Sequence, residues 1–93
     1  MVPKTKLNDE LFKAILNLKT LDDCYLFFTD LCTMKEIESM AQRIQAAKLL
    51  LQNKTYEEVI KETSISSATL SRVSRCIKYG DGGYKKVLLD SKE

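Results

Sequence analysis

The chain has 93 residues, of which 44% are hydrophobic and 30% charged, and its net charge is +2. This length and composition fit one folded globular domain and argue against global disorder. The apolar runs are far shorter than a membrane span, and residues 1–7 have no apolar core, which argues against a signal peptide.

The first two helices are predicted by their caps and apolar spacing. Asn8 or Asp9 can cap a helix with apolar residues between Leu11 and Leu16, and Thr20 can cap a second helix. Apolar residues cover most of the circumference of the second helix: Leu21, Cys24, Tyr25, Leu26, Phe27, Phe28, Leu31 and Cys32. Such a helix must be buried on more than one side, and so small a monomer offers little interior for it. We therefore expect a homodimer packed through these helices; the alternative is a compact monomer with this helix at its centre.

Two capping boxes predict where the next helices begin. Thr33 with Glu36 opens a long third helix, and Thr55 with Glu58 opens a short fourth one. Nothing in the chain predicts a strand.

The fifth helix is capped by Ser66 or Ser67 and runs to about Tyr79. Gly80 is a natural residue to end it, because glycine tolerates a positive φ, and a last short helix follows at 84–89. The predicted fold class is all-α with six helices and a single domain, 1–93. Its parts are N-terminal dimerisation helices 1–32, a long core helix 33–54, a helix-turn-helix 55–79, and a C-terminal turn with a short helix 80–93.

The segment Thr55–Lys78 has the pattern of a helix-turn-helix: a short helix, a three-residue turn and a longer helix. Leu70, Val73 and Ile77 form its buried stripe. Hydroxyl side chains gather at the start of the longer helix, where a recognition helix meets base edges, and basic side chains that suit phosphates follow. The predicted contacts to double-stranded DNA are Tyr56, Ser66, Ser67, Ala68, Thr69, Ser71, Arg72, Arg75 and Lys78.

The charge distribution agrees with a polyanionic partner. Residues 66–93 carry six Lys and Arg against three Asp and Glu, and this segment holds the whole positive excess. The alternative is a helical module that docks on another protein and reads no bases. Glu57 and Glu58, which would repel nearby phosphates, count in favour of that alternative.

The stretch that begins MKEIESMAQRIQ and ends IKYGDGGY resembles the Trp repressor family, and especially a branch of small bacterial Trp-repressor-like proteins with a YGDGGY-type segment. The similarity covers about Thr33–Leu89, with Ala68–Arg72 (ATLSR) and Ala41–Arg43 (AQR) as its most specific pieces. The resemblance implies an intertwined homodimer whose recognition helices enter successive major grooves. It also implies a transcriptional repressor of a two-fold-symmetric operator with half-sites roughly 34 Å apart.

The resemblance further places the arginines of a tryptophan pocket at Arg43 and Arg72, a pocket glycine at Val73 and a pocket serine at Cys76. A Val side chain would occupy space that the indole ring needs. We therefore expect no cofactor and argue against tryptophan as the effector, while a dimer that senses another small ligand stays open. The family's turn glycine is replaced by Ser64, which puts the turn geometry in question.

The cysteines and the lack of histidine limit the chemistry of the chain. Three cysteines without a CxxC spacing predict reduced thiols, with no disulfide framework and no metal site. Without histidine the usual general base is missing, so we expect no catalytic residues and no enzymatic activity. The expected location is the cytoplasm, without a membrane partner.

Overall fold

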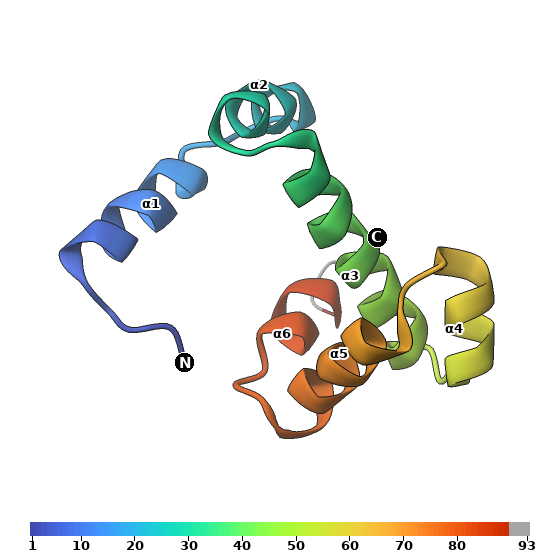
Figure 1. Ribbon diagram of the computed structural model, residues 1–93. Helices are drawn as coiled ribbons and strands as arrows, with labels where there is room; N and C mark the ends of the chain where they lie inside the picture. The colour runs from blue at the N-terminus through green and yellow to red at the C-terminus, as the bar shows by residue number, and fades with distance from the viewer. Residues whose placement is uncertain (90–93) are drawn as a thin grey trace. The chain divides into compact units, whose positions relative to one another are not determined.

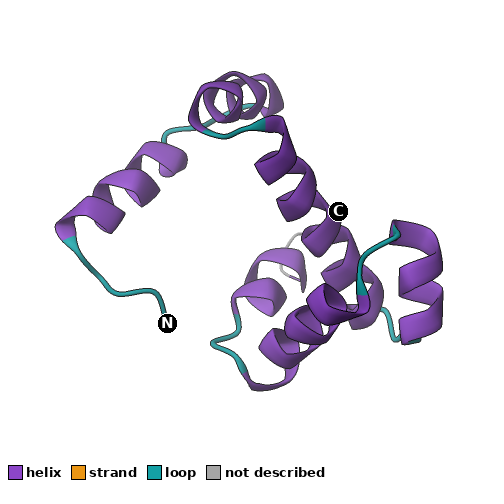
Figure 2. Cartoon of the chain, in the orientation of Figure 1, coloured by secondary structure: helices purple, strands orange, loops and turns teal. Residues whose placement is uncertain are grey.

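The structure is a computed structural model that describes residues 1–89, and every regular element within this range is a helix (Figures 1 and 2). The helices are α1 (Lys6–Leu16), α2 (Leu21–Leu31), α3 (Met34–Leu51), α4 (Tyr56–Thr63), α5 (Ser67–Tyr79) and α6 (Gly83–Leu89). The predicted all-α fold with six helices is confirmed. The last four residues of the predicted segment 80–93 lie outside the described range. Packing divides the chain into two compact units, Met1–Ile37 and the part from Glu38 onward.

In the first unit, α1 begins earlier than the sequence predicts. Its cap is Thr5, whose Oγ1 accepts a hydrogen bond from the backbone N–H of Asn8 at 3.1 Å. The side-chain amide of Asn8 donates back to the Pro3 carbonyl at 2.8 Å. The prediction of Asn8 or Asp9 as the cap is therefore wrong, because residue 8 already belongs to the first helical turn.

The predicted cap of α2 is confirmed, since Thr20 Oγ1 accepts from the Asp23 backbone N–H at 3.0 Å. The helix has no fully buried residue within this chain. Leu21 and Leu26 remain 73% and 71% exposed, and Tyr25 is 69% exposed. A single copy of the chain thus leaves most of this apolar helix without cover.

The second unit has its core where α4 and α5 lie against the C-terminal half of α3 (Figure 1). Its central cluster contains Ala46 of α3, Val59 of α4 and Leu70 of α5. Ile65, from the turn between α4 and α5, completes the cluster. The two alanines at positions 46 and 47 are fully buried. Because their side chains are small, they allow the helix-turn-helix to approach the α3 backbone closely.

The chain leaves α3 through a tight turn that sets the start of α4. Asn53 adopts a φ of 67°, its N–H donates to the Leu50 carbonyl at 3.0 Å, and the Lys54 N–H donates to the Leu49 carbonyl at 3.1 Å. This is a Schellman motif, which satisfies the last carbonyls of the helix. The capping box of Thr55 and Glu58 follows at once, so that one helix ends and the next begins within a few residues.

The end of α5 differs from the prediction at Gly80. Its φ is −86°, and Gly82 is instead the glycine with a positive φ, at 87°. Gly80 is constrained for a steric reason, because an added Cβ would collide with the backbone carbonyl oxygen of Cys76. That same oxygen accepts the Gly80 N–H at 2.9 Å, so the last turn of α5 closes tightly.

Ser64 ends α4 in the left-handed conformation, with φ 60° and ψ 20°. This conformation costs a non-glycine residue about 1–2 kcal/mol. Glycine avoids that cost, but it also makes the unfolded chain more flexible, which offsets part of the gain. We therefore expect Ser64→Gly to raise the free energy of unfolding by roughly 0.5–1 kcal/mol. Urea denaturation at fixed protein concentration measures it. Ser71→Gly, within the exposed part of α5, is the matched control and should lower stability; a destabilised Ser64→Gly would contradict the strain argument.

Candidate DNA-binding surface

The turn between α4 and α5 is held by a short network of hydrogen bonds. Thr63 Oγ1 donates to the Val59 carbonyl at 2.8 Å and accepts the Ile65 N–H at 3.1 Å. The side chain of Gln42, from α3, donates to the Thr63 carbonyl at 2.8 Å. Ile65 is 2% exposed, and it therefore anchors the turn in the core. This role of Gln42 was not predictable from spacing, because a half-buried glutamine inside a helix gives no pattern that reveals its partner.

The cap of α5 is Ser66. Its Oγ accepts the Thr69 N–H at 3.1 Å and donates to Thr69 Oγ1 at 2.9 Å. Both hydroxyls are thus engaged with each other at the helix start. Ser66, Ser67 and Ser71 are all exposed, whereas Thr69 is half-buried.

The outward face of α5 is basic. Ala68, Arg72 and Arg75 are spaced by four and three residues, so they share one side of the helix, and all three are exposed. Leu70 and Val73, at 0% and 1% exposure, hold the opposite side in the core. The helix therefore cannot turn this face inward without exposing its core residues.

Tyr79 continues the line of the arginines at the end of α5 and is 83% exposed. Tyr79 was not among the predicted contacts, because its place in the sequence marks only the end of the helix. It adds an aromatic ring to the same side.

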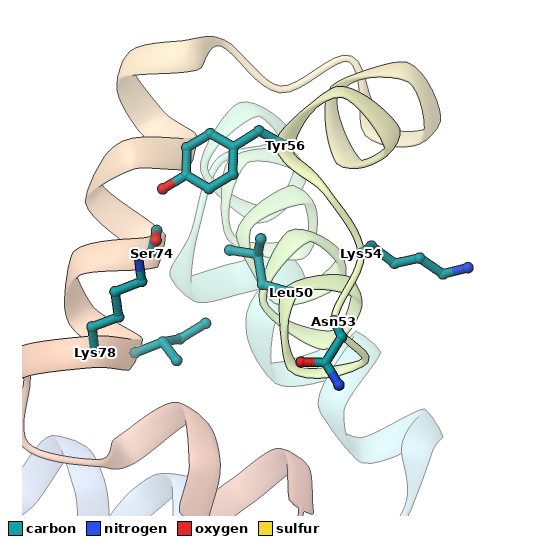
Figure 3. Close-up of a pocket in the computed structure, with 7 residues that line it drawn as sticks. Leu50, Asn53, Lys54, Tyr56, Ser74 and Lys78 are labelled. Atoms are coloured by element: carbon teal, nitrogen blue, oxygen red, sulfur yellow. The ribbon is translucent and has the colours of Figure 1, made fainter.

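Lys78 lies on the flank of α5 that faces Tyr56, the first residue of α4. Together with Ser74 they line a pocket of about 300 Å³ (Figure 3). Ser74 is 5% exposed and had no place in the predicted site. Sequence spacing places Ser74 at the edge of the buried stripe, where a small polar residue is compatible with either a buried or an exposed position.

The four residues that the resemblance assigns to an effector pocket differ in their surroundings. Val73 is buried in the core, whereas Cys76 is an exposed free thiol. Arg43 is half-buried, and its Nε lies 3.4 Å from the Ser39 carbonyl. Arg72 belongs to the outward face of α5 described above. The Val73 side chain is therefore almost fully enclosed by the rest of the chain.

Glu58 is fixed by its own cap. The Thr55 N–H, at 2.8 Å from Glu58 Oε1, lowers the pKa of this carboxyl below its ordinary value of 4.5. A carboxyl whose pKa is lower in the folded state stabilises the protein. The stabilisation is complete at a pH above the pKa of the unfolded state, and it is lost as the pH falls through the pKa of the folded state.

We expect Glu58→Gln to flatten the acid limb of the stability curve. In the wild type the melting temperature should fall as the pH drops below 4.5, since protonation removes the carboxylate from its cap. The variant lacks this titration and should follow a shallower curve. Thermal melts across this range check it, with Glu57→Gln, which lies outside the capping box, as the control. Parallel curves for wild type and Glu58→Gln would refute the role of the cap.

The described residues offer little scope for other kinds of site. Within residues 1–89 no group of three His, Cys, Asp or Glu side chains is placed to hold a metal ion. No helix of this range is both long and apolar enough to cross a bilayer.

The fold and this surface define a helix-turn-helix protein. A family model described as Trp repressor protein matches residues 6–92, and the chain therefore belongs to the Trp repressor family, as its sequence resemblance predicted. The uncharacterized protein YerC of Bacillus subtilis strain 168 is 49% identical over 85 residues, which cover 91% of this chain and 82% of YerC.

Two solved structures are similar along nearly the whole chain. A candidate Trp repressor from Staphylococcus aureus has a TM-score of 0.90 and 44% identity, and covers 94% of this chain and 87% of its own. A TrpR-like protein from Eubacterium eligens ATCC 27750 has a TM-score of 0.89 and 46% identity, covering 97% and 95%. The Trp-repressor-like fold is thus confirmed.

Proposed function

We propose that this protein is a sequence-specific DNA-binding transcriptional repressor that acts in the cytoplasm as a homodimer. The observation that carries the proposal is the outward face of α5, where Arg72 and Arg75 stand exposed on a helix whose other side is locked in the core. A rigid helix with basic and small hydroxyl side chains fits the major groove of B-DNA. Membership in a family of regulators supports the same role.

The apolar surface of α2 supports the dimer. In one copy of the chain, Leu21, Tyr25 and Leu26 remain mostly exposed, and such a surface is costly in water. A second copy that covers it would bring two recognition helices into one particle, which matches a two-fold-symmetric operator. Sedimentation at micromolar concentration should give the mass of two chains; a monomer would contradict this part of the proposal.

We also propose that tryptophan is not the effector of this protein. The buried side chain of Val73 supports it, because an indole ring would need the space that the isopropyl group occupies. Saturating tryptophan should therefore leave both the melting temperature and the DNA affinity unchanged. A tenfold gain in affinity with tryptophan would overturn this view.

The decisive experiment is selection of bound duplexes from a randomised library. We expect enrichment of an inverted repeat with half-site centres about 10 base pairs apart. The enriched duplex should bind roughly 1,000-fold or more tightly than a random one at the same salt concentration, and it should block transcription when placed over a promoter. Equal affinity for all duplexes would contradict sequence-specific binding and favour a module that docks on a protein.

A further inference from the structure

A second polar surface runs along α5, beside the arginine face. Ser67, Ser71, Ser74 and Lys78 are spaced by four, three and four residues, which places them on one flank of the helix. Its C-terminal part, Ser74 and Lys78, lies beside Tyr56 at the start of α4. The pocket of about 300 Å³ opens at its C-terminal end, between the end of α3, the first residue of α4 and the last turns of α5.

Three hydrogen-bond donors gather on one side of this pocket. Figure 3 shows the Tyr56 hydroxyl, the Ser74 hydroxyl and the Lys78 ammonium on the side formed by α5. Tyr56 is the first residue of α4, and so two separate helices supply these groups. Ser74 is held by the fold, since it is 5% exposed, whereas Tyr56 and Lys78 are exposed and stay accessible to a ligand.

The lining suits an anion. It contains no Asp or Glu, and its remaining members are the apolar Leu50 and Ile77, the amide of Asn53 and Lys54. The Lys54 side chain points away from the pocket in Figure 3 and leaves Lys78 as the ammonium on the donor side. A water molecule takes about 30 Å³ in the liquid, so the pocket has room for a phosphate group and several waters.

We propose that this pocket binds a phosphate of the DNA backbone when the arginine face of α5 enters the major groove. The inference rests on the proposed function and adds an anchor to it. In helix-turn-helix complexes the first helix lies across the sugar–phosphate backbone while the second lies in the groove. A pocket at the junction of these two helices is placed for the backbone at the groove edge. Hydroxyl and ammonium donors there fix the register of the protein and carry no sequence information.

The test compares two lysines that line the same pocket. Lys78→Met removes the ammonium of the donor side, and Lys54→Met is the matched control. The affinity for a random-sequence duplex is measured over a series of salt concentrations. In Lys78→Met we expect the slope of log affinity against log salt to become shallower by about 0.9, the value for one phosphate that the protein no longer neutralises. In Lys54→Met the slope should stay near the wild-type value.

Two neutral variants test the hydroxyls. Ser74→Ala and Tyr56→Phe each remove one oxygen and keep the shape of the side chain, and a far-UV circular dichroism spectrum checks that the helices persist. We expect each to weaken binding of random and enriched duplexes by the same factor of about 3- to 10-fold, as loss of a hydrogen bond of about 1 kcal/mol predicts. The ratio of the two affinities should stay unchanged.

The outcomes separate the pocket from the function. If Lys78→Met and Lys54→Met give equal slopes, the pocket proposal is overturned, whatever the sequence preference of the wild type. If the slopes differ but enriched and random duplexes bind alike, the proposed function fails and the pocket proposal stands. Inorganic phosphate distinguishes the source of the phosphate: stabilisation of the DNA-free wild type that Ser74→Ala loses, together with unchanged slopes, would assign the pocket to a free phosphate compound and overturn the DNA anchor.

Discussion

Replacing Arg72 and Arg75 together with alanine will weaken binding of the enriched duplex by about 30-fold or more at constant salt. Both side chains are exposed on the outward face of α5, so their removal leaves the core intact. A contact of arginine to guanine or phosphate contributes about 1–3 kcal/mol, and two such contacts give at least the stated factor. Fluorescence anisotropy with labelled duplex measures the affinity.

The control for this result removes the same two charges elsewhere. Lys13→Ala with Lys35→Ala takes two exposed lysines from α1 and α3, outside the helix-turn-helix. We expect this variant to bind within a few-fold of the wild type, because long-range attraction by net charge is weak at physiological salt. Equal losses in both double variants would mean that α5 attracts DNA only through net charge, and the assignment of the reading face would be wrong.

Leu70→Ala will lower the free energy of unfolding by about 2–5 kcal/mol. Leu70 is fully buried and contacts the cluster formed by Ala46, Val59 and Ile65. Truncation removes apolar packing and leaves a cavity, and small domains have only about 5–15 kcal/mol of stability in total. Urea denaturation followed by circular dichroism gives the value, at one fixed concentration because assembly would add to stability.

The matched control is Ile60→Ala on α4. Ile60 is 37% exposed, so its truncation should cost clearly less than that of Leu70. We expect Leu70→Ala to lose DNA binding as well, since α5 would no longer be held against α3. Retention of both stability and DNA binding would show that the core of the helix-turn-helix lies elsewhere.

The helix-turn-helix was predictable because local and long-range signals agree there. The capping box at Thr55 and Glu58 and the stripe of Leu70 and Val73 specify the helices, and the sequence resemblance independently points to the same segment. Even the departure at Ser64 is informative, because the structure gives it the left-handed backbone that glycine would favour. The turn therefore keeps the left-handed backbone at Ser64 although this conformation is strained for serine.

The predictions of helix ends were wrong where several neighbouring residues could have the same role. Three potential caps lie around the first turn of α1. Thr5 is the cap because its Oγ1 accepts the Asn8 N–H, while the Asn8 side chain bonds the Pro3 carbonyl, and spacing reveals neither bond. At Gly80 the expected positive φ belongs to Gly82 instead. Ser74 was missed because its burial depends on the neighbouring α4, whose packing no residue-by-residue pattern contains.

The roles of the predicted DNA contacts depend on geometry that a sequence lacks. The Ser66 hydroxyl holds the cap of α5, whereas Ser67 and Ser71 face solvent. Adjacent residues of the same type thus have different tasks. Whether each touches a base or a phosphate stays a prediction.

The glycines after α5 imply that the segment following this helix tolerates mutation unevenly. At Gly80 any side chain meets the Cys76 carbonyl, whereas at Gly82 space is open but the backbone conformation is strained for other residues. Gly83 has neither restriction, since nothing lies within 4 Å of its added Cβ. Random mutagenesis should therefore recover Gly83 substitutions freely, Gly82 changes mainly to Asn or Asp, and Gly80 changes rarely. In related proteins, the backbone conformation of this short segment would therefore limit which substitutions accumulate there.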